Sequence, residues 1–300
     1  MMWNDIFLQG DAGKLPFADQ SVDLVFGSPP YQDCRTYGIN AQRDCRTWID
    51  WMLQVTREAC RVSRGLVLWV VGGTTRQWCY QPGPEGLLYE WWRQGGQCWR
   101  PVYWGRTGIP GSGGKQWLRA DVEYVLCFKG APGPISWADN VACGQPPKWT
   151  GPQRNQWGGT KKSSGHRRKN GSTESFVRPS HVIAGEPKAR LGRDSLKGSC
   201  LGFNPPLANP GNLLYIPVGG GMLGHKLAHL NEAPFGERLA EFFILGWCPP
   251  GGVVCDPFSG SGTTVAAAVK HGRRGIGLDV RLSQCRLGAR RCRELQGEIF

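Results

Sequence analysis

A short turn, Ser28-Pro29-Pro30-Tyr31, contains side chains that could take part in chemistry. It follows the apolar residues 24–27, which are typical of a buried parallel strand, and its prolines must end that strand because proline has no N–H to donate. The turn therefore lies at the carboxyl end of a strand, where open α/β sheets bind ligands. Ser28 and the Pro29 carbonyl offer hydrogen-bond acceptors there, and Tyr31 offers a ring for stacking. These groups could hold a planar ring with an exocyclic amine, although a plain proline-rich turn also fits the pattern.

A second stretch, residues 253–264, combines a short apolar strand, a glycine-bearing turn and an alanine-rich helix start. The glycines at 260 and 262 let a ligand approach the backbone closely, and the helix start presents N–H groups that have no partner within the helix. Asp279 ends the next strand and follows Phe258 at close to the roughly 20-residue spacing at which an acidic residue meets ribose hydroxyls in dinucleotide folds. The turn lacks the full G-x-G-x-x-G pattern, and no Walker lysine follows it. A nucleoside cofactor therefore fits better than a nucleoside triphosphate.

Alternating strands and helices must position these two turns, because apolar runs and stretches of helical spacing follow one another along the chain. We expect Trp91 and Trp92 to be core residues, the polar residues 32–46 to form a loop over the site, and the arginines after Asp279 to form a solvated helix face. The expected strands are 6–11, 24–27, 65–71, 99–103, 122–128, 253–256 and 275–279, and the expected helices are 48–62, 237–245, one that starts at 87–92 and one after Asp279.

The two turns together closely resemble the amino-methyltransferases of DNA, which use S-adenosyl-L-methionine. That family joins a (D/N/S)-P-P-(Y/F/W) catalytic turn to an F-x-G-x-G cofactor turn, matched here by residues 28–31 and 258–262. The catalytic turn comes first, which resembles the circularly permuted β group of the family. Residues 121–126 and 231–239 are similar to two further family segments, with Asn231 and Gly236 as departures.

The resemblance implies an α/β fold of the Rossmann-like class I methyltransferase type, with a seven-stranded, mostly parallel, circularly permuted sheet and an inserted basic region. Residues 1–130 would form the catalytic half of the methyltransferase domain, 131–212 a target-recognition insertion that binds DNA, and 213–300 the cofactor-binding half. Asp11 would lie beside the adenine of the cofactor, although a helix cap is a nearly equal alternative. The implied catalytic residues are Ser28, Pro29, Pro30 and Tyr31, and the implied cofactor-binding residues are Asp11, Asp256, Phe258, Ser259, Gly260, Gly262, Thr263 and Asp279.

The resemblance further implies methyl transfer to an exocyclic amine of a base flipped out of double-stranded DNA and stacked on Tyr31. Ser28 favours N4 of cytosine, because a serine at this place is more typical of the cytosine-N4 enzymes than of the adenine-N6 enzymes. An adenine-N6 enzyme is the first alternative, an RNA or protein methyltransferase is a more distant one, and a DNA-binding module without activity is the third. Methylation of an amine needs no cysteine nucleophile.

The net charge of +13 favours a polyanionic partner, although a membrane surface or RNA would also fit. Basic residues are concentrated between Lys148 and Lys197, where few apolar residues occur and aromatic residues are interleaved. We expect this segment to contact DNA, with a solvated basic linker as the alternative. The candidate phosphate-binding residues are Lys161, Lys162, Arg167, Arg168 and Lys169.

Other classes of protein are disfavoured by what the sequence does not contain. No stretch approaches the roughly 18 consecutive apolar residues of a spanning helix, and the start is unlike a signal peptide. We therefore expect a cytoplasmic protein, of a prokaryotic or phage-infected cell, without a membrane partner. The twelve cysteines are scattered without a C-x-x-C pair, which indicates reduced, apolar cysteines. His225 and His229 have helical spacing but no third ligand, so no metal is expected. A restriction-enzyme partner and the choice between monomer and dimer stay open.

Overall fold

The computed structural model describes residues 6–32, 43–106, 118–130, 133–146 and 207–299. The chain separates into two compact units, residues 1–143 with 211–300 and residues 144–210. In the second unit, an antiparallel bridge joins Gln145 and Ala208. All helices and strands of the described residues belong to the first unit, and none of these helices is long and apolar enough to span a membrane.

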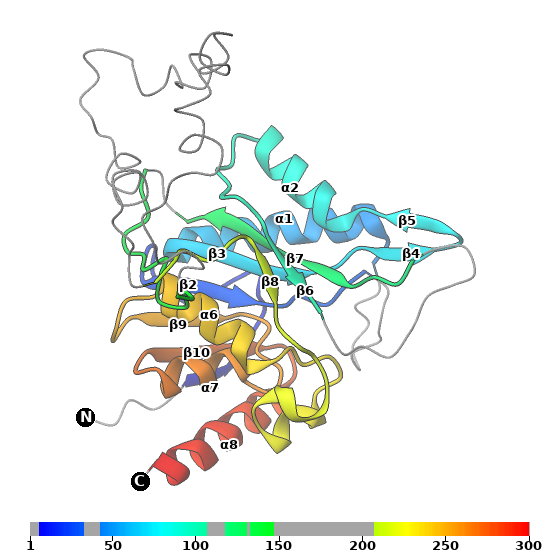
Figure 1. Cartoon of the computed structure of the whole chain (residues 1–300). Coiled ribbons are helices and arrows are strands. Elements are labelled where there is room, and N and C mark those ends of the chain that lie inside the picture. Colours follow the sequence, from blue (N-terminus) through cyan, green and yellow to red (C-terminus); the bar gives the residue numbers. More distant parts are fainter. Residues whose placement is uncertain (1–5, 33–42, 107–117, 131–132, 147–206, 300) are drawn as a thin grey trace, which may run out of the picture. The chain divides into compact units, whose positions relative to one another are not determined.

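The described strands form one sheet of eight strands and a separate two-stranded hairpin (Figure 1). The strand order of the large sheet is β1-β10-β9-β2-β3-β7-β6-β8. The five strands from β1 to β3 are parallel neighbours, β7 is antiparallel to β3 and β6, and β8 is parallel to β6. The strands are β1 (Ile6–Gln9), β2 (Val22–Gly27), β3 (Ser63–Val71), β4 (Thr74–Arg76), β5 (Cys79–Gln81), β6 (Val102–Gly105), β7 (Val122–Lys129), β8 (Leu213–Tyr215), β9 (Val253–Asp256) and β10 (Arg274–Asp279).

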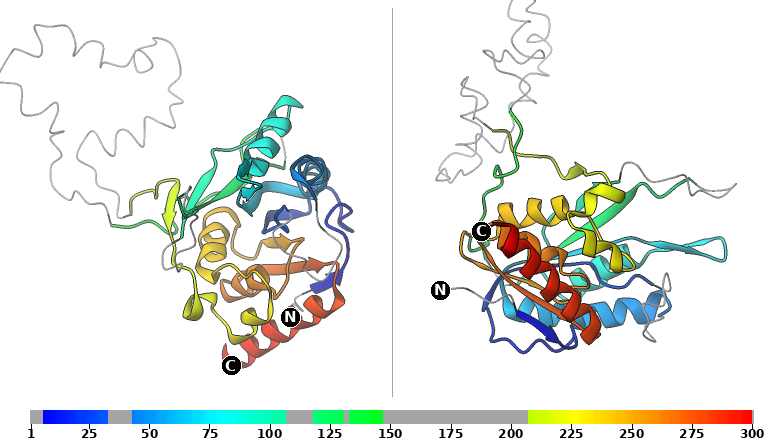
Figure 2. Two further views of the ribbon diagram at one scale, coloured as in Figure 1. Left: turned by 90° about the vertical axis from the view of Figure 1, so that its right-hand side faces the viewer. Right: turned by 90° about the horizontal axis from the view of Figure 1, so that it is seen from below.

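Helices cover both faces of the sheet (Figure 2). α1 and α2 share one apolar core with Val25 and Trp69 of the sheet, whereas α6 and α7 share another with Phe26 and Leu68. α8 packs on α7 and β1 through a small third cluster that contains Cys292. The helices are α1 (Cys45–Val62), α2 (Gly83–Arg93), α6 (Glu237–Trp247), α7 (Thr263–Lys270) and α8 (Leu282–Ile299), with the short 3-10 helices η3 (Gly220–Leu223) and η4 (Lys226–Leu230).

The centre of the sheet joins two parts of the chain that are far apart in sequence. β2 pairs in parallel with β9, with Leu24 opposite Val254 and Val25 opposite Cys255. The helix after β2 lies on one face of the sheet and the helix after β9 on the other. Such a change of face between adjacent parallel strands leaves a crevice at their carboxyl ends. Both turns singled out in the sequence open into this crevice.

The α/β class and the mostly parallel sheet are confirmed, and four details of the prediction are wrong. The sheet has eight strands rather than seven, because the short β8 adds to β6. β6 starts at Val102, just after Pro101, and not at Trp99. The β4–β5 hairpin was not expected. Trp91 is buried as predicted, but Trp92 is 65% exposed.

Asp23 connects the two parts of the chain beside the β2–β9 pair. Its carboxylate is 3% exposed and accepts hydrogen bonds from the Val253 N–H at 2.8 Å and from Arg64 Nε at 2.6 Å. Burial acts to raise the pKa of Asp23, but these bonds outweigh burial and hold the pKa below its usual value. The stability that Asp23 contributes is therefore present at neutral pH and is lost as the pH falls through the lowered pKa.

We expect Asp23→Ala to lower the free energy of unfolding by about 2–3 kcal/mol, because a buried N–H and a guanidinium lose their acceptor. Urea unfolding followed by circular dichroism measures this loss. Asp19→Ala is the matched control, since Asp19 also pairs with an arginine, Arg61, but its side chain is 74% exposed. A loss in the control as large as that in Asp23→Ala would contradict the structural role given to Asp23.

Candidate active site

A cavity of about 810 Å³ lies at the carboxyl ends of β2, β3, β9 and β10. Its wall contains both turns predicted from the sequence, although they lie at opposite ends of the chain. The predicted site residues that line it are Asp11, Ser28, Pro29, Pro30, Tyr31, Phe258, Ser259, Gly260, Thr263 and Asp279. The structure therefore brings these residues together in one concave site of the size that binds a small molecule.

The turn after β2 is held by hydrogen bonds to neighbouring elements. Ser28 Oγ donates to the Val70 carbonyl at the end of β3, at 3.0 Å. Trp48 of α1 donates from its indole Nε1 to the Pro30 carbonyl at 2.8 Å. A Cβ at Gly27 would lie 2.5 Å from an Asp256 oxygen, so only glycine allows the ends of β2 and β9 to come this close. These contacts fix the direction in which the turn presents its groups to the cavity.

Tyr31 is anchored by a buried carboxylate. Its hydroxyl donates to Glu123 Oε2 at 2.9 Å, and the other oxygen of Glu123 accepts from Arg106 at 2.5 Å. Burial raises the pKa of the Glu123 carboxyl, although Arg106 and Tyr31 oppose that shift. Glu123 and Arg106 also line the cavity. The sequence had matched Glu123 to a family strand, but its bond to Tyr31 was missed, because only the pairing of β3 with β7 places β7 beside the turn.

The glycine-bearing turn after β9 is held by two carboxylates. Asp279 Oδ2 accepts from the Gly260 N–H at 3.1 Å, and its Oδ1 accepts from the Arg281 N–H at 2.9 Å. Gly260 and Gly262 have positive φ angles of 48° and 77°, which L-residues with side chains rarely adopt. A Cβ at Gly260 would also lie 2.6 Å from the Asn231 side chain. The turn thus needs glycine both for its conformation and for its close packing.

Asp256 lies behind this turn and not in the cavity wall. Its Oδ1 accepts from the Phe258 N–H at 2.9 Å, and its Oδ2 accepts from Thr264 Oγ1 at 2.7 Å. Burial raises the pKa of Asp256 to about 7, and the hydrogen bonds from Thr264 and Phe258 oppose that rise. Gly262 is likewise absent from the wall, and it precedes α7 as its N-cap residue. These two residues shape the turn, and the cofactor contacts that the resemblance implies for them stay a prediction.

Aromatic rings and an unpaired hydroxyl form the wall near Phe258. The Phe258 ring meets Trp51 and Trp69 edge to face, at centroid distances of 5.8 and 5.7 Å. Trp51 also lines the cavity and was missed in the sequence, where it only falls within the expected helix 48–62. The Ser259 hydroxyl is buried and has no hydrogen-bond partner among the described residues. An aromatic wall, an unpaired hydroxyl and the Asp279 carboxylate fit a nucleoside that carries hydroxyl and amino groups.

Asp11 lies at the rim of the cavity, after β1. The Asp11 residue is exposed, and its Oδ1 accepts from the Gly13 N–H at 2.8 Å. This bond is a local turn contact and not a helix cap. Asp11 therefore keeps one carboxylate oxygen toward which no described residue donates, at the place where the resemblance puts the adenine.

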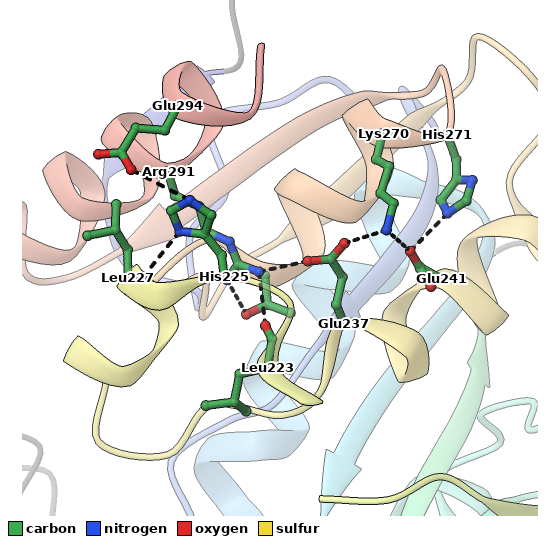
Figure 3. A network of polar contacts seen from close by, with 10 residues as sticks. Leu223, His225, Leu227, Glu237, Glu241, Lys270, His271, Arg291 and Glu294 are labelled. Atoms are coloured by element: carbon green, nitrogen blue, oxygen red, sulfur yellow. Dashed lines mark hydrogen bonds and ion pairs between the residues drawn. The ribbon is translucent and has the colours of Figure 1, made fainter. Parts of the chain in front are cut away.

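A buried arginine supports the start of α7 from behind (Figure 3). Arg291 of α8 is fully buried and donates to Thr263 Oγ1 at 2.8 Å and to Glu237 Oε2 at 3.0 Å. Glu237 is shared with Lys270, which also pairs with Glu241 at 2.7 Å. Burial lowers the pKa of Arg291, although Glu237 opposes this, and an arginine stays charged. The prediction of a solvated face is therefore wrong for Arg291, whose network ties α6, α7 and α8 together beneath the cavity.

The two histidines have structural surroundings. His225 accepts from the Leu227 N–H through Nδ1 at 3.2 Å and caps η4, and its Nε2 lies 3.6 Å from Glu294 (Figure 3). His229 lies on the same short helix and is exposed. Among the described residues no three His, Cys, Asp or Glu side chains form a group that could hold a metal ion. The predicted DNA-binding residues, Lys161, Lys162, Arg167, Arg168 and Lys169, lie outside the described residues.

The sequence matches a family of known proteins over most of its length. The family model described as DNA methylase, for N6 and N4 methyltransferases, matches residues 22–290. The orphan methyltransferase M.BamHII of Bacillus amyloliquefaciens is 27% identical over 282 residues, which cover 91% of this chain and 89% of that relative. The DNA adenine methyltransferase YhdJ of Escherichia coli strain K12 is 35% identical over 82 residues, which cover 27% of each chain.

Solved structures share the fold. TTHA0409, a putative DNA modification methylase from Thermus thermophilus solved as a complex with S-adenosyl-L-methionine, has a TM-score of 0.57 at 23% identity and covers 97% of this chain and 94% of its own. The PvuII DNA methyltransferase, described as cytosine-N4-specific, has a TM-score of 0.61 at 18% identity and covers 98% of this chain and 91% of its own. At such low identities the likeness shows the fold alone.

The raised pKa of Asp256 predicts a dependence of stability on pH. The folded protein binds this proton more tightly than the unfolded chain, whose aspartates have a pKa of about 3.9, so the contribution of Asp256 to stability falls as the pH rises from about 4 to about 7. Asp256→Asn cannot ionise, and its amide can both accept from the Phe258 N–H and donate to Thr264. We therefore expect the stability of the variant relative to the unmodified protein to increase with pH over this range. Urea unfolding at a series of pH values measures the difference in the free energy of unfolding between the two proteins. A difference that does not change with pH would contradict the raised pKa of Asp256.

Proposed function

The chain belongs to the DNA methylase family of N6 and N4 methyltransferases, and from that premise we propose that it methylates the exocyclic N4 amine of a cytosine flipped out of double-stranded DNA. The observation that carries transfer to an exocyclic amine is the hydrogen bond from Ser28 Oγ to the Val70 carbonyl, and a serine at this place favours cytosine among the two bases. Because the hydroxyl proton is committed to Val70, the Ser28 oxygen remains an acceptor in the cavity wall. An acceptor is what the two hydrogens of the target amine require.

The turn can activate a weak nucleophile. The lone pair of a ring amine is delocalised, so the amine nitrogen must become more tetrahedral before it can attack a methyl group. The Ser28 oxygen and the Pro29 carbonyl would each accept one amine hydrogen and favour that change, in a position fixed before the substrate arrives. S-adenosyl-L-methionine supplies the methyl group when bound. Its carbon–sulfur bond would break as the methyl group bonds to the amine nitrogen, and the amine, held by Ser28 and Pro29, would lose one proton to solvent.

Tyr31 provides the surface on which the flipped base stacks. Its ring is held in one orientation because the hydroxyl is bound to Glu123, which Arg106 holds in turn. The Tyr31 hydroxyl therefore donates its proton to Glu123 and not to the base. Tyr31 therefore acts through its ring face, while Ser28 and Pro29 provide the polar recognition of the amine.

The remaining cavity residues hold the cofactor in this proposal. Asp279 would accept from the ribose hydroxyls through Oδ2, which has a lone pair beyond the one used by Gly260, whereas Oδ1 already accepts from the N–H and from Nε of Arg281. Phe258 packs against the methionine moiety, and the unpaired Ser259 hydroxyl bonds to a polar group of the same molecule. Asp11 accepts from the adenine amine, and Gly260 and Thr263 complete the wall. Asp256 and Gly262 act indirectly, by holding the turn.

We further propose that the chain is of the permuted β group and that residues 131–212 form the target-recognition region. Its Lys161, Lys162, Arg167, Arg168 and Lys169 would contact phosphates, which supply much of the affinity for DNA irrespective of sequence. Adenine-N6 methylation is the second candidate, and the match to the adenine methyltransferase YhdJ favours it. M.BamHII is named an orphan methyltransferase, so we propose no companion restriction enzyme.

The choice of base can be tested on DNA methylated by the purified protein. We expect mass spectrometry of the digested nucleosides to detect N4-methylcytosine. Ser28→Ala should reduce turnover on the order of 100-fold with cofactor affinity retained, by analogy with the loss of one transition-state hydrogen bond. Detection of N6-methyladenine without N4-methylcytosine would contradict cytosine as the target base, but it would still support methyl transfer to DNA. Full activity of Ser28→Ala would overturn the role of the turn.

The cofactor site can be tested by calorimetry. We expect Asp279→Asn to weaken the binding of S-adenosyl-L-methionine about 10- to 100-fold, because a charge-assisted bond of roughly 1.5–3 kcal/mol is lost while the amide oxygen can still accept from one backbone N–H. Asp19→Asn is the control, since Asp19 pairs with Arg61 and neither residue lines the cavity. Equal affinity in both variants would contradict the contact with ribose.

A further inference from the structure

The β4–β5 hairpin projects beyond the end of β3 (Figures 1 and 2), and residues at that end of β3 line the cavity. β3 ends at Val71, Gly72 and Gly73 line the cavity, and β4 begins at the next residue, Thr74. Three pairs of residues, from Thr74–Gln81 to Arg76–Cys79, form the ribbon. At about 3.4 Å per residue its tip extends roughly 10 Å beyond the rim of the cavity.

The tip of the hairpin is strained and carries a large exposed ring. Gln77 and Trp78 form the two-residue loop, and both have positive φ angles, of 47° and 66°. Such turns favour Asn-Gly, because bulky side chains rarely adopt this conformation. Trp78 is nevertheless 73% exposed. Strained residues of this kind cluster where function requires them, and an exposed ring at a projecting tip is typical of a surface that meets a binding partner.

The base of the hairpin is fixed to the catalytic side of the cavity. Tyr80 donates from its hydroxyl to Glu85 at 2.8 Å, and Glu85 also accepts from Tyr124 at 2.8 Å. Thr74 Oγ1 donates to the side chain of Gln32, which follows Tyr31 and is buried, at 3.3 Å. A Cβ at Gly73 would lie 2.2 Å from the Tyr80 hydroxyl, so the ribbon packs directly over the backbone that leads into it. The tip is therefore held at a defined place relative to Tyr31.

The chemistry of the ribbon suits a duplex of DNA. Its exposed residues include Thr75, Arg76 and Gln77, whose side chains can bond base edges, and no carboxylate lies between 74 and 81. A two-stranded ribbon fits the major groove, and an aromatic or apolar side chain at such a tip can enter a base step. A protein surface would gain less from this composition, because two exposed rings, Trp78 and Tyr80, and a single cation offer little area to bury.

We propose that the β4–β5 hairpin enters the major groove of the substrate and that Trp78 occupies the base step from which the target base is extruded. This inference rests on the proposed function, since it requires a base that leaves the stack. The ring fills the gap and stacks on the bases that remain, while the extruded base lies on Tyr31. The hairpin is thus a second DNA-contacting element, on the catalytic half of the chain and distinct from the basic segment between 148 and 197.

The test separates the Trp78 ring from the fold of the hairpin. The double variant Gln77→Asn with Trp78→Gly removes the ring and creates the favoured turn sequence, so the protein should stay folded, which circular dichroism checks. The substrate is a duplex oligonucleotide with a site that the unmodified protein methylates, compared with the same duplex carrying a mispaired target base. Trp92→Ala is the matched control, since Trp92 is 65% exposed on α2.

We expect the double variant to lose at least 10-fold in kcat/KM on the paired duplex and no more than about threefold on the mispaired one, because an unpaired base costs less to extrude. Its affinity for S-adenosyl-L-methionine and the activity of Trp92→Ala should not change. Unaltered methylation of the paired duplex, or equal losses on both substrates, would overturn this inference alone. A protein that methylates no DNA would overturn the proposed function and this inference with it.

Discussion

The site depends on the pairing of β2 with β9. Each strand ends in one of the two turns that line the cavity, and the two strands belong to parts of the chain far apart in sequence. Asp23 secures the start of β9 through the Val253 N–H, and Gly27 lets the strand ends approach within contact of Asp256. If this pairing were lost, Ser28 and Phe258 would lie on separate pieces of chain and no cavity would exist.

The turns and most of the strands could be predicted because their signals are local. Pro29 and Pro30 end a strand wherever they occur, and the glycines at 260 and 262 mark a turn whatever surrounds it. The bond between Tyr31 and Glu123 and the burial of Arg291 could not be predicted, because both depend on which elements pack together. The prediction that Trp92 is buried was wrong for a related reason, since two adjacent tryptophans on a helix do not indicate which of the two rings faces the sheet.

Buried acids recur around the cavity, and each has a different task. Asp279 holds Gly260 and also lines the cavity, Asp256 holds the turn from behind, and Glu123 holds Tyr31. Glu237 performs a similar task for Arg291 and Lys270. Fixed carboxylates therefore determine the shape of the site before any ligand binds, which reduces the entropy lost when substrates are aligned. The shape of the cavity therefore depends on hydrogen bonds from these carboxylates as well as on side-chain packing.

The order of the strands also has a consequence for synthesis on the ribosome. β1 pairs with β10, and β2 pairs with β9, so the first strands to emerge must wait for partners that are translated near the other end of the described chain. Until then β2 has only β3 beside it, and the N–H and C=O groups along its other edge are unpaired. Loop closure over such a distance is slow, and unpaired strands attract other chains. A nascent chain of this topology therefore completes the cavity last, and we expect chaperones that shield β2 to influence the yield of folded protein.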